Sequence, residues 1–145
     1  MRSIYVARSQ GLQKWGEGVG VTKHLYKIAL AEDDVDEAIA RLNEEAHAGE
    51  SDWRLVKKAP AGDLDETIMF DRIAVKEKAI DPRYYPKIKN ATGVFKVKPA
   101  NVENYFLVKA ALEGHAREDV KIRPAEISTY LIACALADRQ AASTG

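Results

Sequence analysis

The sequence has little cysteine and no long apolar segment, and each shortage excludes a class of protein. Cys134 is the only cysteine, so no disulfide can form within the chain, which suits a reducing compartment. No apolar run reaches the ~20 residues of a membrane-spanning helix, and the first residues lack the apolar core of a secretion signal. We therefore expect a soluble, cytoplasmic protein without a membrane partner.

Net charge is also missing, because lysine plus arginine and aspartate plus glutamate both total 22. This balance neither favours nor excludes a nucleic-acid partner. The length of 145 residues fits one domain with a single core, and the 46% of hydrophobic residues is ordinary for a globular protein. An argument for any partner must therefore come from local patches.

Several chemistries lack the residues that they need. His24, His47 and His115 stand far apart without ligand partners at zinc spacing, so we expect surface or cap positions for them. No Ser-His-Asp arrangement is suggested, and Cys134 falls on an apolar helix stripe, where a thiol is inert. The glycine-rich residues 9–23 match neither phosphate-binding loop motif and predict an irregular connecting loop.

The clearest pattern lies in residues 25–43, LYKIALAEDDVDEAIARLN. Apolar residues fill both alternating faces of residues 25–30, which is typical of a central strand. Asp33 and Asp34 suit the N-terminus of a following helix. That helix is expected to bury Val35, Ala38, Ile39, Leu42 and Ala46.

The rest of the chain supplies further short strands and helices. The other expected strands are residues 3–8, 52–58 and 91–98, and the other expected helices are 63–80, 101–114 and one that begins at Pro124. Two of these helices carry stripes that we expect to be buried: Leu64, Ile68, Val75 and Ala79 in the first, and Val102, Tyr105, Phe106, Val108 and Leu112 in the second. Asn101 is expected to cap the second.

Together these elements predict an α+β fold with a small, three- to four-stranded, largely antiparallel sheet. We expect helices mainly on one face of the sheet and a further C-terminal helix. Residues 1–114 form the predicted domain, and residues 115–145 form a helical extension and tail of it. The last helix has apolar residues on two sides, so packing on the domain and dimerisation both stay open.

A basic and aromatic segment, residues 83–98, is the best local patch for a nucleic-acid partner. Its candidate contacts are Arg83, Tyr84, Tyr85, Lys87, Lys89, Lys96 and Lys98. Lysine and arginine neutralise phosphates, and tyrosine stacks on bases. The alternative is that Phe95 and one tyrosine belong to the core while the lysines cover an outer strand face.

Four short motifs occur in an order that resembles a known family. They are Ser3-Ile4-Tyr5-Val6, Tyr26-Lys27-Ile28-Ala29, Arg41-Leu42-Asn43 and Gly93-Val94-Phe95-Lys96-Val97. In this order they resemble the GIY-YIG nuclease superfamily, in the branch whose second motif reads Lys-Ile-Gly. The resemblance covers residues 3–106, with Ser3 and Ala29 where the family has glycine.

The resemblance implies a domain that cuts phosphodiester bonds in DNA with one divalent cation. In the family, motif tyrosines lie near the attacking water, a helix arginine contacts the phosphate and a glutamate holds the metal. By position, the resemblance assigns Tyr5, Lys27 and Arg41 to catalysis and Asp71 to the metal. It also implies Mg²⁺ or another divalent cation as cofactor and DNA as partner.

The chain departs from the family at two of these positions. The arginine position falls on Ala38, so Arg41 would reach the site only with a shifted register. The glutamate position falls near Asp71, whose reach is shorter, with Glu66 and Glu77 as alternatives. We therefore expect nucleic-acid binding with weak or lost nuclease activity. An active Mg²⁺-dependent endonuclease and a protein-interaction domain are the alternatives.

Overall fold

The sheet has five strands in the order β3-β1-β2-β5-β4, and every neighbouring pair is antiparallel. The computed structural model describes residues 2–88, 91–114 and 120–136. The strands are β1 (Ser3–Ser9), β2 (Leu25–Ala31), β3 (Trp53–Pro60), β4 (Lys78–Ala79) and β5 (Val94–Lys96). The α+β class is confirmed, but the predicted three to four strands fall short because β4 is only two residues long.

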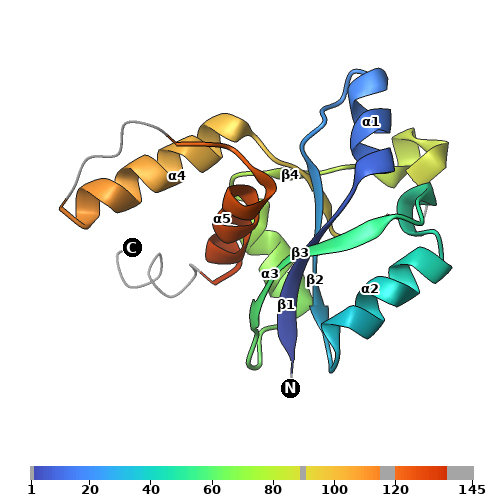
Figure 1. Ribbon diagram of the computed structural model, residues 1–145, viewed down its shortest axis with the longest axis horizontal. Coiled ribbons are helices and arrows are strands. Elements are labelled where there is room, and N and C mark those ends of the chain that lie inside the picture. The colour runs from blue at the N-terminus through green and yellow to red at the C-terminus, as the bar shows by residue number, and fades with distance from the viewer. Residues whose placement is uncertain (1, 89–90, 115–119, 137–145) are drawn as a thin grey trace.

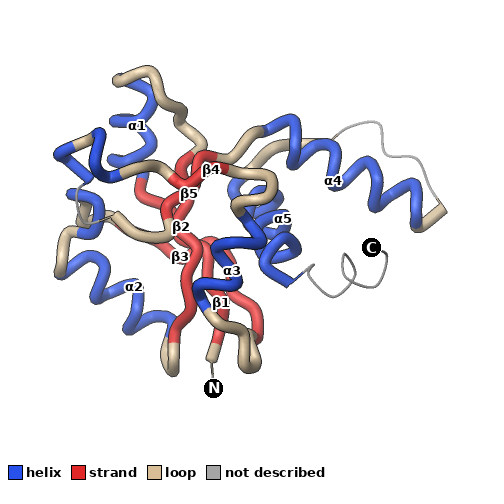
Figure 2. Tube along the Cα trace, turned by 180° about the vertical axis from the view of Figure 1, so that it is seen from behind, coloured by secondary structure: helices blue, strands red, loops and turns tan. Residues whose placement is uncertain are grey.

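Helices cover both faces of the sheet. They are α1 (Gln10–Gly18), α2 (Val35–Glu44), α3 (Glu66–Ile73), α4 (Pro99–Leu112) and α5 (Pro124–Leu136), with 3₁₀ turns at His47–Gly49, Pro82–Tyr84 and Pro86–Ile88. Figure 1 and the reverse view in Figure 2 place α1 and α2 on one side and α3, α4 and α5 on the other. None of the helices in the described ranges has the length and apolar content to cross a membrane.

The prediction of helices mainly on one face is wrong because the strands carry two apolar faces. Alternate side chains of β2 point to opposite faces, and both sets are buried. Tyr26 and Ile28 join the core under α3, α4 and α5, whereas Leu25 and Ala29 join the core under α1 and α2. With β1 and β5 as its neighbours, β2 is the central strand that its sequence predicts.

Helix α1 replaces the irregular loop that the glycines in residues 9–23 suggested. The side chain of Ser9 caps the helix by accepting a hydrogen bond from the Leu12 amide at 3.1 Å. A Cβ on Gly16 would lie 2.3 Å from the carbonyl oxygen of Thr22. This glycine therefore allows a close approach between two segments and does not mark a loop.

Helix α3 is shorter than the expected helix over residues 63–80, because the chain leaves the helix after Ile73. Three members of the expected apolar stripe are exposed: Ile68 by 45%, Val75 by 80%, and Ala79 in β4. Glu77 instead turns inward and is fully buried, where its carboxylate accepts hydrogen bonds. A buried carboxylate with partners redirects the chain against the local helical pattern.

Helix α4 begins at Pro99, which suits the first turn of a helix. Asn101 does not cap it, since its side-chain amide donates to Glu77 at 2.8 Å. Val108 and Leu112 are exposed by 48% and 83%, against our expectation, because the second half of α4 extends away from the body of the molecule (Figure 1).

Helix α5 packs on the domain, which is one of the two possibilities left open by its sequence. Ile127, Tyr130 and Leu131 are buried in the same core as strand β1. The guanidinium of Arg72 on α3 donates to the carbonyl of Ala135 on α5 at 2.7 Å. The last helix thus helps to cover one face of the sheet.

Candidate functional site

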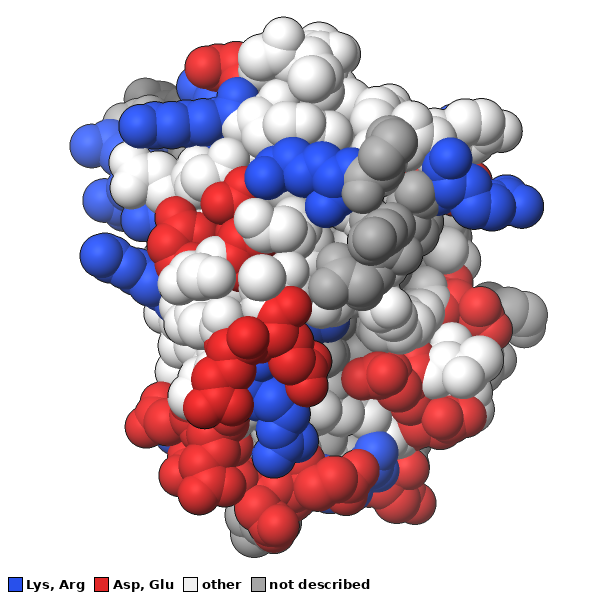
Figure 3. All heavy atoms as spheres, turned by 90° about the vertical axis from the view of Figure 1, so that its right-hand side faces the viewer, with Lys and Arg blue, Asp and Glu red and all other residues white. Residues whose placement is uncertain are grey.

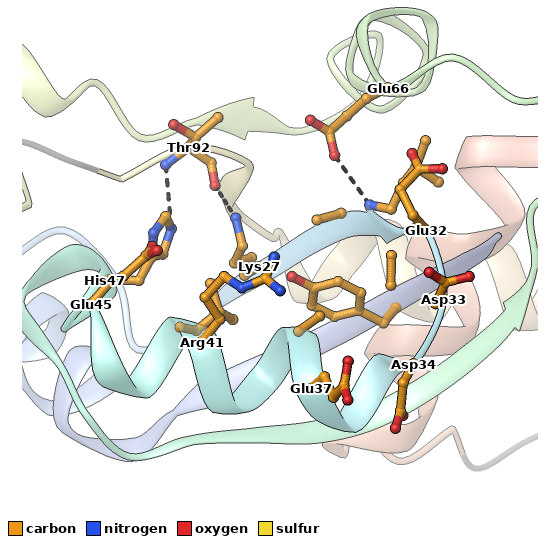
Figure 4. Close-up of a pocket in the computed structure, with 16 residues that line it drawn as sticks. Lys27, Glu32, Asp33, Asp34, Glu37, Arg41, Glu45, His47, Glu66 and Thr92 are labelled. Carbon is orange, nitrogen blue, oxygen red and sulfur yellow. Dashed lines mark hydrogen bonds between the residues drawn. The ribbon is translucent and has the colours of Figure 1, made fainter.

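An open pocket of about 410 Å³ lies between helix α2 and the sheet. Its floor comes from β1 and β2, and the start of α3 and the segment around Thr92 lie across from α2 (Figure 4). The polar residues at its centre are Tyr5, Lys27, Arg41, His47, Glu66 and Thr92.

The pocket brings together the three residues that the sequence assigned to catalysis. Tyr5 pairs with Ala29 across the β1–β2 ladder, which puts Tyr5 and Lys27 diagonally on one face of neighbouring strands. Arg41 reaches the same pocket from α2 (Figure 4). Ala38 also lines the pocket, because residues three and four apart share a helix face. The shifted register that we thought necessary for Arg41 is therefore not required.

Lys27 is the most unusual of these residues because its amine is buried. Only 5% of the residue is exposed, and Nζ donates a hydrogen bond to the carbonyl oxygen of Thr92 at 2.6 Å. Burial lowers the pKa of Lys27 to about 8, while the negative charge of Glu66 works in the opposite direction. The ammonium of Lys27 therefore loses its proton much closer to neutral pH than an ordinary lysine does.

Tyr5 keeps its proton at neutral pH. Burial raises the pKa of Tyr5 to about 12, the carboxylate of Glu66 adds to the rise, and the charge of Arg41 opposes it. A phenol in this state donates a hydrogen bond or a proton and does not act as a base. Its role in the pocket is that of a donor.

His47 is buried beside Lys27, so its prediction as a surface or cap residue is wrong. Its Nε2 accepts a hydrogen bond from the amide of Thr92 at 3.4 Å. Burial and the charge of Lys27 lower the pKa of His47 to about 4, so the ring is neutral. The two neighbours of His47, Ala46 and Ala48, adopt left-handed backbone conformations with φ of 50° and 56°.

Glu66 is the acidic residue of α3 that reaches the pocket. It is the first residue of the helix, and its Oε2 accepts the amide of Leu30 on β2 at 3.1 Å. Asp71 is exposed and, in the described part of the chain, lies outside the pocket lining. Glu77 faces away, bonded to the hydroxyl of Tyr130 at 2.5 Å. Of the three candidate metal ligands, the pocket contains Glu66.

Further carboxylates surround the mouth of the pocket, and we call them the acidic rim. The acidic rim consists of Glu32, Asp33, Asp34, Glu37 and Glu45. Figure 3 shows acidic side chains gathered over the lower half of this side of the molecule and basic ones in the upper half. The acidic rim gives the pocket a negative potential that attracts cations.

Among the central polar residues of the pocket, Glu66 is the one carboxylate. Across residues 2–88, 91–114 and 120–136, no three His, Cys, Asp or Glu side chains are grouped closely enough to hold a metal ion. Mg²⁺ is commonly bound through one or two carboxylates and retained waters. Glu66 supplies one such carboxylate beside Lys27 and Arg41.

The basic and aromatic segment, residues 83–98, has several of its members engaged elsewhere. Arg83 pairs with Asp81 at 3.0 Å, and Lys87 pairs with Glu50 at 2.7 Å. The ring of Tyr85 packs edge-on against Trp15 at 5.4 Å.

The other members of this segment differ in exposure. Phe95 is buried in the core and Lys96 is half-buried, whereas Tyr84 and Lys98 are exposed. Lys89 lies outside the described residues.

Two pocket residues carried no usable signal in the sequence. His47 and Thr92 meet only through the packing of two distant turns, and neither belongs to a recognisable motif. Glu66 could be named as an alternative because it lies one or two helical turns from Asp71. No known protein family, curated protein or solved structure matches this chain.

Proposed function

We propose that this chain is a divergent GIY-YIG-like domain whose pocket binds a phosphate of DNA together with a divalent cation, with weak or lost nuclease activity. One observation carries the proposal: Tyr5, Lys27 and Arg41, which the motifs place at sequence positions far apart, line one pocket. The pairing of β1 with β2 and the packing of α2 on that face bring the three side chains to one pocket, an arrangement that supports the proposal.

The groups in the pocket match the needs of a phosphate. Arg41 offers a guanidinium that binds phosphate oxygens through paired hydrogen bonds, and Lys27 adds a second cation when it is protonated. The phenol of Tyr5 donates a further hydrogen bond. A divalent cation at Glu66 would polarise the phosphoryl oxygen and offset its charge.

The same pocket explains why hydrolysis should be weak. Tyr5 has a raised pKa and is a poor base for activating water. The acidic rim repels a polyanion unless bound cations neutralise it. Phosphate binding therefore depends on the cation, and strand cutting is slow or absent.

Protein binding is a second candidate because α4 exposes large apolar residues. Leu107, Val108 and Leu112 are exposed by 38%, 48% and 83%. Exposed apolar side chains grouped on one helix are typical of a contact surface for another protein. This candidate and the pocket lie on different parts of the molecule and can be tested separately.

A binding assay with matched variants tests the proposal. A labelled DNA duplex of about 20 base pairs is titrated with the full chain in Mg²⁺, and binding is followed by fluorescence polarisation. We expect Arg41→Gln to weaken binding roughly tenfold, the loss of a charged hydrogen bond. Lys98→Gln, which removes an exposed cation of the segment 83–98, should leave the Kd nearly unchanged.

If Lys98→Gln weakened binding and Arg41→Gln left the Kd unchanged, the nucleic-acid site would lie in residues 83–98 and not in the pocket. Absence of binding by the unmodified chain, with and without Mg²⁺, would reject the nucleic-acid proposal and leave protein binding through α4. A parallel incubation followed on a gel should show little or no cutting of the duplex by the unmodified chain.

A further inference from the structure

Lys27 combines properties that a lysine used only as a phosphate contact does not need. The residue is only 5% exposed and lines an open pocket. Its hydrogen-bond acceptor is the neutral carbonyl of Thr92 and not a carboxylate. Burial disfavours the ammonium and favours the free amine, which is the nucleophilic form, and a neutral carbonyl offsets this less than a bonded carboxylate would.

The neighbours of the amine supply what its attack on a carbonyl group requires. The phenol of Tyr5 is diagonal to Lys27 on the same sheet face and retains its proton, so it can protonate a departing hydroxyl. The neutral ring of His47 adds no second positive charge beside the reaction. The pocket is large enough for a sugar phosphate.

We propose that Lys27 forms an imine with the aldehyde of an abasic deoxyribose in DNA held at the pocket. This inference rests on the proposed function, because unmodified DNA has no free aldehyde and the sugar of an abasic site opens to one. The missing base also leaves the sugar free to turn out of the duplex into a pocket.

The proposed step balances without an oxidant or a further reactant. The lone pair of Nζ attacks C1′ of the aldehyde, and a proton passes from nitrogen to the former carbonyl oxygen to give a carbinolamine. The phenol of Tyr5 then protonates that hydroxyl, which leaves as water while the C1′–N double bond forms as an iminium. The Tyr5 phenolate takes back the remaining proton from nitrogen, which gives the imine and restores the phenol. Hydrolysis by water reverses the sequence and releases the amine.

Trapping with borohydride tests the inference on the full chain. One duplex carries a single abasic site, and a matched duplex carries a tetrahydrofuran analogue that has no aldehyde. In Mg²⁺ and sodium cyanoborohydride, we expect a stable one-to-one adduct with the abasic duplex alone. Peptide mass mapping of the unmodified chain should place the adduct on Lys27.

Two variants and a pH series add matched controls. Lys27→Met should lower the trapping rate at least tenfold, and Lys109→Met, which removes an exposed lysine of α4, should leave it unchanged. The trapping rate should rise with pH to a midpoint below 10.5, because burial lowers the pKa of Lys27. Mapping on the unmodified chain remains decisive if Lys27→Met does not fold.

The outcomes separate the two proposals. Binding of the tetrahydrofuran duplex without an adduct on the abasic duplex would overturn the imine and leave the proposed function intact. Adducts spread over exposed lysines would also overturn it. If neither duplex binds, the proposed function fails and the imine inference fails with it.

Discussion

At the scale of single residues, the pocket depends on an amine that the fold keeps out of water. Burying an ammonium costs free energy, and the pKa of Lys27 falls to about 8 in response. Thr92 stabilises the side chain through its carbonyl, and the same residue fixes His47 through its amide. The backbone of Thr92 thus positions both the amine of Lys27 and the imidazole ring of His47.

This lowered pKa predicts how stability changes with pH. The folded-state pKa of about 8 lies below the ordinary 10.5, so between these values the unfolded chain binds more protons and the free energy of unfolding rises with pH. The cost of burying the charge is fully present below pH 8. The Lys27→Met variant lacks this cost at every pH.

Urea unfolding at several pH values measures the effect. From pH 7 to pH 10, the stability of the unmodified chain should rise relative to Lys27→Met by on the order of 2 kcal/mol. Lys109→Met should follow the unmodified chain throughout. A constant difference between the unmodified chain and Lys27→Met would show that the amine is solvated in the folded state.

At the scale of elements, sequence patterns predicted the strands that form the site and failed where tertiary contacts override local preference. The alternation over residues 25–30 identified β2, and Asp34 marked the start of α2, whose N-cap it is. The glycines of α1 and the apolar spacing beyond Ile73 misled us. In the first case a close approach of Gly16 to Thr22 decides the structure, and in the second a contact between distant segments does.

The candidate site was predictable to the same extent. Tyr5, Lys27 and Arg41 could be found because they belong to motifs or to a strong helix. The choice between Glu66 and Asp71 could not be made, because it depends on where α3 starts relative to the edge of β2. Periodicity alone does not fix that position.

Two glycines in α1 give a matched test of the close approach. Gly16→Ala should destabilise the chain by about 2 kcal/mol, because the added Cβ would lie 2.3 Å from the carbonyl oxygen of Thr22. Gly18→Ala meets nothing within 4 Å and should stabilise it by about 0.5 kcal/mol through helix propensity. Thermal unfolding of both variants measures this, and equal effects would contradict the packing of α1.

At the scale of the whole molecule, the two faces of the sheet differ in how completely they are covered. The face under α3, α4 and α5 is a closed core, whereas the face under α2 holds the pocket. Glu66 links the two faces. It is the first residue of α3, which covers the closed core, and its carboxylate lines the pocket and accepts a hydrogen bond from the backbone amide of Leu30 in β2. The acidic side of the site is therefore fixed by the packing of α3.

A Mg²⁺ titration followed by NMR tests the proposed binding of a divalent cation at Glu66. The amide of Leu30 donates to Glu66, so its signal reports on that carboxylate. We predict that the Leu30 signal shifts with Mg²⁺, that Glu66→Gln abolishes the shift, and that Asp71→Asn, on the same helix, preserves it. A response that survives Glu66→Gln and disappears with Asp71→Asn would contradict the account, as would no response in the unmodified chain.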